Sequence, residues 1–232
     1  MAMPTSARLL SLLHFADSAF PAGGYAHSFG LEACCQSGAV TDAAGVEQFL
    51  TSQLEGSAGP CDATAAAAAR AAFAGGDLAT CRRLDDMIEA MKSVREFREG
   101  SRQMGRQTLR VAAALTADVG LDGYRAEVDA GRAPGHHAVA FGMAAGALGW
   151  EPEETAAAFL YSTTALLVGA ALRLLPLGQT QGQRLLWRLH PVIERLAREA
   201  AQRDPSRMWS FAPGIELAGI RHEGLEMRLF RS

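Results

Sequence analysis

The sequence has 232 residues, a formal net charge of −3 and an apolar fraction of 49%. This length fits one domain, and the apolar content excludes an intrinsically disordered chain, which has less to bury and more net charge. The near balance of 22 basic and 25 acidic residues leaves no overall positive field, so nucleic acid is not an expected partner. Alanine is abundant and aromatic residues make up only 7%, which favours closely packed helices.

Proline and glycine divide the chain into helical segments, and no strand-like alternation stands out. In the first half of the chain, helices are predicted over residues 7–16, 28–38, 42–55 and 61–74, followed by a helix that Asp77 caps at its start. In the second half, helices are predicted over residues 92–117, from Glu151-Pro152 to Arg173, and over residues 179–202. The last of these is expected to break or kink at Pro191. Residues 56–60 (Gly-Ser-Ala-Gly-Pro) are expected to stop the third helix, and the chain after Arg203 is left as a tail. The sequence therefore predicts one all-α domain over residues 1–232, a bundle of about nine or ten helices.

Two apolar segments resemble membrane signals. Leu9 to Leu13 is followed by His14 and Asp17, which interrupt the unbroken apolar run that a signal peptide needs, so we interpret this segment as an amphipathic helix. Residues 155–172 carry no charge, but their serine, threonines and alanines favour the buried central helix of a bundle over a membrane span. The four cysteines form no CxxC pair, which favours reduced, mostly buried thiols and a cytoplasmic protein.

A search for catalytic and metal-binding motifs is largely negative. The sequence has no GxxxxGK[ST], no HExxH and no GxSxG, and its one lysine, Lys92, follows no glycine-rich loop. His136 and His137 are adjacent, and two interpretations remain: a two-ligand metal site, or two partly solvated histidines at a helix start. We expect no catalytic residue, no bound metal and no cofactor in this chain.

Five arginines at helical spacing share one face of the segment 92–117, with Glu96 and Glu99 beside them: Arg95, Arg98, Arg102, Arg106 and Arg110. This face is either a solvated, salt-bridged surface or a docking surface for an acidic partner, and the spacing alone supports both interpretations.

Two further motifs are unusual. Residues 20–30 place Gly23-Gly24 among Tyr25, His27 and Phe29, and the double glycine permits positive φ and a close backbone approach. This segment is either a tight interhelical turn or an exposed recognition loop. Residues 176–183 hold three glutamines, whose neutral amides suit a buried network at a helix start or the wall of a polar channel.

With these motifs the sequence resembles the urease accessory proteins of the UreF type. Three stretches carry the resemblance: residues 17–32 (DSAFPAGGYAHSFGLE), 173–184 (RLLPLGQTQGQR) and 221–232 (RHEGLEMRLFRS). The segment 136–142 (HHAVAFG) is also similar, whereas residues 61–90 match only in helical character. The order and spacing of these stretches suit the whole chain.

The resemblance implies an all-α fold, often as a homodimer, and a non-catalytic scaffold role in the maturation of urease, a nickel enzyme. Proteins of this type bind UreD (UreH in some systems), recruit the GTPase UreG and dock on apo-urease, which supports nickel insertion. It also implies a cytoplasmic protein that binds neither a membrane nor nucleic acid. Two alternatives stay open: a generic all-helical adaptor unrelated to urease, and an enzyme of unrecognised type. An older role in activating the GTPase also stays open, because an arginine can serve it.

The expected partner-binding residues lie in the three stretches that carry the resemblance. They are Gly23, Gly24, Tyr25, His27, Ser28, Glu32, Pro176, Gly178, Gln179, Gly182, Gln183, Arg221, His222, Glu223, Leu225, Arg228, Leu229 and Phe230. Residues 204–232 are predicted to form a C-terminal tail that docks on UreD and stays outside the core. Deleting residues 221–232 is then expected to leave helicity and the melting temperature nearly unchanged.

The missing motifs lead to a first testable prediction. We expect the purified, tag-free chain to hydrolyse no GTP and to bind nickel no more tightly than scattered surface histidines do. Phosphate release and calorimetric titration with Ni²⁺ measure the two properties. Stoichiometric, sub-micromolar nickel binding would contradict the prediction.

Overall fold

The computed structural model describes residues 5–232, which form α-helices and no β-strand. The helices are α1 (Thr5–Ala16), α2 (Leu31–Gln36), α3 (Ala43–Gln53), α4 (Thr64–Ala74), α5 (Leu78–Met91), α6 (Arg95–Thr116), α7 (Val119–Asp129), α8 (His137–Ala147), α9 (Pro152–Leu174), α10 (Gln179–Gln202) and α11 (Pro213–His222). A π-helical segment, η2 (Leu54–Ala63), joins α3 to α4. The predicted all-α class is confirmed, and residues 5–232 form eleven α-helices where about nine or ten are expected.

Helices α4 and α8 form the most extensive helix–helix contact in the bundle, and glycine and alanine allow them to pack closely. A Cβ on Gly142 of α8 would overlap the backbone carbonyl of Ala66, and one on Gly146 would press on the carbonyl of Arg70. Alanines cover the facing surface of α4, where Ala65, Ala66 and Ala69 are fully buried. The alanine-rich composition therefore becomes direct backbone-to-backbone packing in the core, as the sequence indicated.

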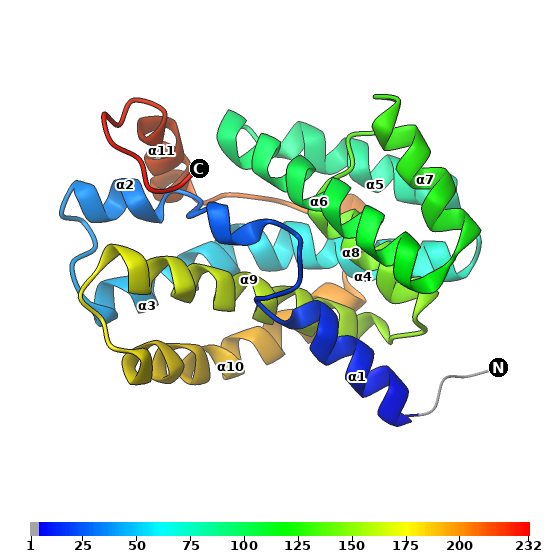
Figure 1. Ribbon diagram of the computed structural model, residues 1–232, viewed down its shortest axis with the longest axis horizontal. Coiled ribbons are helices and arrows are strands. Elements are labelled where there is room, and N and C mark those ends of the chain that lie inside the picture. Colours follow the sequence, from blue (N-terminus) through cyan, green and yellow to red (C-terminus); the bar gives the residue numbers. More distant parts are fainter. Residues whose placement is uncertain (1–4) are drawn as a thin grey trace.

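This pair joins the two halves of the bundle (Figure 1). On one side α8 packs against α6, and α5 and α7 complete that half; on the other side α4 packs against α9, which lies along α10 with η2 and α3. Among the described residues, α9 is the one helix long and apolar enough to cross a membrane, but most of its apolar stretch is buried inside the bundle. The interpretation of residues 155–172 as a central helix is confirmed.

Helix starts follow the capping residues in the sequence. The Asp77 carboxylate accepts from the Thr80 N–H at 2.9 Å, which confirms the predicted cap of α5. At α9, Glu151 and Glu154 form a capping box around Pro152, as expected for a helix start with acidic residues at its positive end. Helix α10 runs unbroken from Gln179 to Gln202 and contains Pro191.

Two predicted boundaries are wrong. Residues 56–60 do not stop the third helix, because the chain continues through η2 with Pro60 inside it. Pro60 has no N–H and donates no hydrogen bond there, so the chain passes through it in a π-helical segment and not in a regular α-helix. Gly56 is there for packing, since its carbonyl accepts from the Phe211 N–H at 2.7 Å and a Cβ would meet Phe211. The helix expected from residue 28 begins at Leu31, because Phe29 and Gly30 have φ values of 48° and 89°.

The contact between α4 and α8 gives a testable prediction about stability. We expect Gly142→Ala to lower the free energy of unfolding by about 2 kcal/mol or more, because the new methyl group forces two backbones apart. Gly123→Ala on α7 is the matched control, since its Cβ meets nothing within 4 Å and should add up to about 1 kcal/mol of helix propensity. Urea unfolding of both variants measures the effects. Equal stability of the two would show that α8 can shift without cost.

Candidate functional site

The glycine-rich loop (residues 17–30) and the C-terminal segment (residues 223–232) lie side by side, although they come from opposite ends of the sequence (Figure 1). The backbone oxygen of Ser232 accepts from the N–H groups of Ser28 and Phe29 at 2.6 and 2.9 Å, and from the Ser28 hydroxyl at 2.7 Å. The Arg231 N–H donates to the carbonyl of Ala26 at 2.8 Å. Two of the three stretches singled out in the sequence therefore form one structural unit.

The two glycines of the loop have different structural roles. Gly23 has a φ of 81°, in the left-handed region, with open space where a side chain would lie. Gly24 is buried against α9, where a Cβ would overlap the side chain of Leu166. Both expected properties, positive φ and close approach, are present, and the close approach at Gly24 is to the chain's own core.

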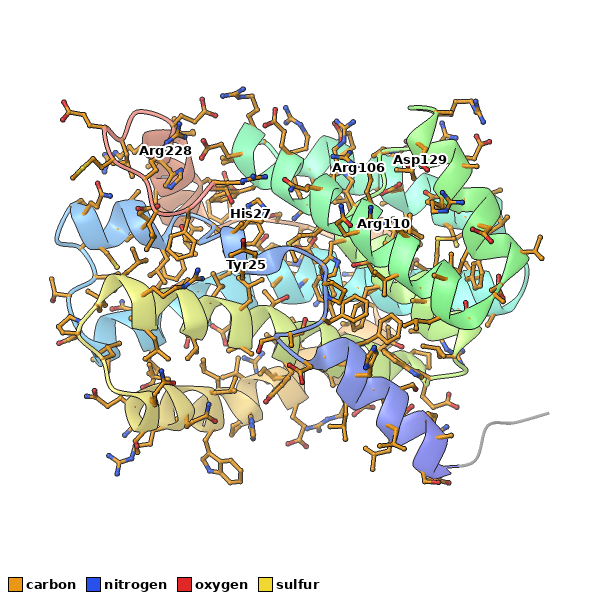
Figure 2. The ribbon with its side chains drawn as sticks, viewed as in Figure 1. Tyr25, His27, Arg106, Arg110, Asp129 and Arg228 are labelled. Atoms are coloured by element: carbon orange, nitrogen blue, oxygen red, sulfur yellow. The ribbon has the colours of Figure 1, made fainter. Side chains whose placement is uncertain are left out.

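The loop divides its large side chains between solvent and core (Figure 2). Tyr25 is 73% exposed, whereas His27 and Ser28 are buried. The His27 ring stacks on Phe29 with centroids 5.5 Å apart, and its Nδ1 lies 2.8 Å from the Ser232 hydroxyl. Burial, with the nearby Arg231, lowers the pKa of His27 to about 4. In the loop Tyr25 is thus available to a partner, and His27 and Ser28 hold the C-terminal segment.

Beneath the C-terminal segment lies a group of ionisable side chains, here called the charged cluster: Glu32, Glu96 and His222, which are buried, and Arg228, which is partly exposed. His222, the last residue of α11, is fully buried between two carboxylates, with Nε2 at 3.0 Å from Glu32 and Nδ1 at 2.6 Å from Glu96. Glu96 also accepts from Arg228 at 2.9 Å. The cluster therefore connects α2, α6, α11 and the C-terminal segment.

Glu32 also fixes the backbone of the C-terminal segment. Its two carboxylate oxygens accept from the N–H groups of Leu229 and Phe230 at 2.7 and 3.0 Å. Burial acts to raise the pKa of Glu32, but these N–H donors and the His222 ring outweigh burial, so the pKa is lowered. Glu32 is an ionised anchor for the segment and faces no solvent.

The prediction that the tail stays outside the core is wrong for Phe230. Its ring is only 4% exposed, belongs to the main hydrophobic core and lies 4.3 Å below the Arg173 guanidinium. Leu225 is half-buried, and Leu229 is 61% exposed beside it. Of the apolar pair Leu229 and Phe230, the chain's own core therefore buries Phe230. Removing residues 221–232 would leave Glu32 and Glu96 without partners, so we expect the deletion to destabilise the protein.

The glutamine motif (residues 176–183) is more exposed than expected. Pro176, Gly178, Gln179 and Gln183 face solvent, so the predicted buried network is wrong. Gln181 caps the start of α10 by accepting from the Gly178 N–H at 2.9 Å, and Gly182 packs closely on Leu172. An open groove brings Gln179 and Gln183 together with Asp17 and Ser18 at the beginning of the glycine-rich loop.

The arginine face of α6 combines both of its interpretations. Arg98 and Arg102 contact Glu89, and Arg95 contacts Glu223 and Glu99, as expected for a salt-bridged surface. Over residues 5–232, Arg106 and Arg110 have no carboxylate within salt-bridge distance, and Figure 2 shows both on the outer side of α6. The docking interpretation stays a prediction for these two.

The His136-His137 pair is buried, which contradicts the partly solvated positions expected at this helix start. His136 Nε2 lies 2.8 Å from Glu89, and His137 Nδ1 lies 3.1 Å from the Thr108 hydroxyl. Burial, with Lys92 and two arginines nearby, lowers the pKa of His136 to about 3, and burial beside Lys92 lowers that of His137 to about 4. Both are neutral core residues, and residues 5–232 contain no group of three metal-ligating side chains.

Lys92 is held inside the protein by an ion pair. Its Nζ lies 2.9 Å from the Asp62 carboxylate, beside a cavity of about 70 Å³ that Ser57, Ser101 and His137 also line. The carboxylate attracts the ammonium more than burial disfavours it, so the pKa of Lys92 is raised. A charged lysine tied to Asp62 cannot reach phosphates in the way that a nucleotide-binding lysine does.

Sequence reasoning missed two residues of this unit. The sequence places Glu96 only beside the arginine face, and Arg173 only at the end of a helix and the start of the stretch 173–184. The spacing of the arginines, three or four residues apart, draws attention away from Glu96, which is buried. An acidic residue in the first turn of a helix was the available signal, because helix N-termini favour carboxylates.

The two last apolar residues of the C-terminal segment provide a matched pair for mutation. We expect Phe230→Ala to lower the free energy of unfolding by about 3 kcal/mol, because it empties a buried site below Arg173. Leu229→Ala should change it by less than about 1 kcal/mol, since that side chain is mostly solvated. Urea unfolding with limited proteolysis near residue 225 measures both. A Phe230 variant as stable as wild type would mean that the segment is not docked in solution.

The buried histidines give a pH dependence. His27, His136 and His137 have lowered pKa values in the folded protein, but in the unfolded chain they titrate near the ordinary 6.5. As the pH falls from about 6.5 to about 4.5, the unfolded state takes up protons that the folded state refuses, so folding weakens by up to about 1.4 kcal/mol per pH unit for each histidine. Urea unfolding across this range measures the change. A flat profile would contradict the burial of the neutral rings.

Comparison with known proteins agrees with these features. Residues 40–190 match the family model described as UreF. The chain is 38% identical to the urease accessory protein UreF of Cereibacter sphaeroides over 229 residues, which cover 98% of this chain and 100% of that relative. It is 35% identical to the UreF of Paenarthrobacter aurescens (96% and 97% covered) and 32% identical to that of Bacillus sp. strain TB-90 (97% and 99%). From the family match and these near-full-length relatives, the chain is a member of the UreF family.

Proposed function

We propose that this protein is a non-catalytic scaffold in urease maturation. It binds UreD (or UreH), and the resulting complex recruits the GTPase UreG to apo-urease and supports nickel insertion into the active site. Membership of the UreF family supports the process, because the matched relatives are urease accessory proteins. The partners then carry out GTP hydrolysis and nickel transfer, and this chain contributes the surface that binds them.

One observation carries the choice of surface: apolar side chains stay uncovered on α11 and the segment after it. They are Leu217, Ile220, Met227 and Leu229, here called the C-terminal apolar surface. Leu217 and Ile220 are three residues apart and so share one face of α11. Uncovered apolar groups rimmed by charges such as Arg221 and Glu223 are typical of protein-binding surfaces. We assign this surface to UreD.

The charged cluster gives this surface its shape. His222 and Arg228 belong to the charged cluster, and Leu225, Glu223 and Arg221 surround it, so the expected partner-binding residues of the tail act in two ways. Some contact the partner, and the others hold the contact residues in place. A surface that is ordered before binding loses less conformational entropy when the partner arrives.

The glycine-rich loop and the glutamine motif would extend the contact area. Tyr25 is exposed at the centre of the loop, and Gln179 and Gln183 line the groove at its beginning. Gly23, Gly24, His27, Ser28 and Glu32 then serve as the frame of the loop, and Pro176, Gly178 and Gly182 as the frame of the motif. Neutral amides and a phenol hydroxyl offer hydrogen bonds to a partner without a desolvated charge.

A second apolar face suits a homodimer. On α1, Leu9, Leu10 and Leu13 point into solvent, and Trp187 of α10 is exposed in the same half of the bundle. We propose that a second copy of the chain covers this face. The proposed complex is cytoplasmic and includes neither nucleic acid nor a membrane. An adaptor role unrelated to urease is disfavoured by the family relationship.

The proposal is tested by charge insertion into the C-terminal apolar surface. We expect Ile220→Asp to reduce co-purification with UreD at least tenfold and to reduce urease activation in cells expressing the urease cluster, because a buried, unpaired carboxylate opposes docking. Val119→Asp is the control: it is 85% exposed on α7, at the other end of the bundle. Both variants should keep the wild-type melting temperature. Normal UreD binding by folded Ile220→Asp would refute the assignment of this surface.

A further inference from the structure

The charged cluster has a hydrogen-bond pattern that a neutral histidine cannot complete. Both ring nitrogens of His222 face carboxylate oxygens, Glu32 at 3.0 Å and Glu96 at 2.6 Å. A neutral imidazole has one N–H, and its other nitrogen presents a lone pair. With a neutral ring and two ionised carboxylates, one of these contacts would place a lone pair against an oxygen anion inside the protein.

Protonation of one carboxylate would also complete the pattern, but the contacts of Glu32 and Glu96 oppose it. Both oxygens of Glu32 already face backbone N–H donors, from Leu229 and Phe230, and one oxygen of Glu96 faces the Arg228 guanidinium. Donors of this kind stabilise the ionised carboxylate. With two buried carboxylates, the partly exposed Arg228 and a neutral ring, the charged cluster would hold one uncompensated negative charge, whereas an imidazolium brings the sum to zero.

The surroundings also favour a positive ring. His222 is the last residue of α11, where the free carbonyl groups attract a cation. The other charged groups nearby are Arg221, exposed on α11, and the ion pair of Glu223 with Arg95 of α6 at 3.2 Å. Glu223 and Arg95 compensate each other at the edge of the cluster, so neither balances the two buried carboxylates.

We propose that His222 is held as an imidazolium, and that this one proton locks the C-terminal segment onto α2 and α6. The ring joins the two carboxylates that in turn hold the segment, Glu32 through the backbone of Leu229 and Phe230 and Glu96 through Arg228. A neutral ring would leave the two carboxylates to share one N–H, and the anchor of the segment would be weaker. Docking of the segment is therefore linked to the second proton of this ring.

Nuclear magnetic resonance on the full-length, ¹⁵N-histidine-labelled protein tests the charge state directly. At neutral pH we expect both ring nitrogens of His222 to carry protons and to show imidazolium shifts, and we expect the neutral pattern for His27, His136 and His137. Comparison with Glu96→Gln assigns the resonance, because removal of one carboxylate alters the His222 ring first. A single-tautomer, neutral His222 in the folded wild-type protein would overturn the proposal without any variant.

Amide hydrogen exchange at Leu229 and Phe230 tests the lock itself. With intrinsic exchange rates corrected for pH, their protection should fall at the same pH at which the His222 ring loses a proton. His222→Gln should exchange roughly tenfold faster or more at neutral pH, because a glutamine side chain cannot donate to both carboxylates. His190→Gln on α10 is the matched control and should exchange like wild type. Protection that persists after the ring becomes neutral, or that is unchanged in folded His222→Gln, would overturn the lock.

Discussion

The contact of His222 with two carboxylates is the interaction on which the arrangement of the motifs depends. Each of its partners comes from a different part of the chain: Glu32 follows the glycine-rich loop, and Glu96 begins α6. Burying charges costs several kcal/mol for each ion unless every charge finds its counterpart. Every charge of the cluster therefore has its counterpart only when α2, α6, α11 and the C-terminal segment are all folded together. A partly folded chain would leave at least one of these charges unpaired.

The rest of the bundle supplies a rigid base for this unit through close packing of small residues. Gly105 of α6 touches the backbone at Gly135, and Gly142 of α8 touches that of α4, so neither helix can slide without a clash. Gly219 of α11 is similarly close to Phe97 of α6, next to Glu96. Interiors packed in this way have low compressibility and hold distances between side chains well. The carboxylates at either side of His222 are thus fixed by backbone contacts.

Much of the fold was predictable because its signals are local. Capping by Asp77 and Glu151, the alanine-rich core helix and the central position of residues 155–172 all follow from neighbouring residues. The failures concern long-range contacts. Gly56 marks a packing contact with Phe211, about 150 positions away in sequence, and Phe230 is covered by Arg173. No local pattern distinguishes a glycine that turns the chain from a glycine on which another segment lies.

The candidate site shows the same division. The sequence identified the loop and the tail as special, but it left the loop open between a tight turn and an exposed loop and placed the tail outside the core. The structure buries His27, Ser28, Glu32, His222 and Phe230. Glu32 is buried beside His222, and Ser28 is buried beside Ser232, because each pair shares hydrogen bonds, and such pairing is invisible in a single sequence. Tyr25 and Leu229, which have no such partners, remain at the surface as expected.

The pairing of Ser28 with Ser232 spans 204 positions, and it sets a time at which the loop can be finished. At about 5 to 20 residues per second, synthesis reaches residue 232 roughly 10 to 40 s after residue 28. During that interval the loop lacks its hydrogen-bond partner, and the Glu32 carboxylate lacks its donors. A chain cut short by even a few residues never acquires them. The loop around Tyr25 therefore gains these hydrogen bonds only after residues 229–232 have been synthesised and have docked.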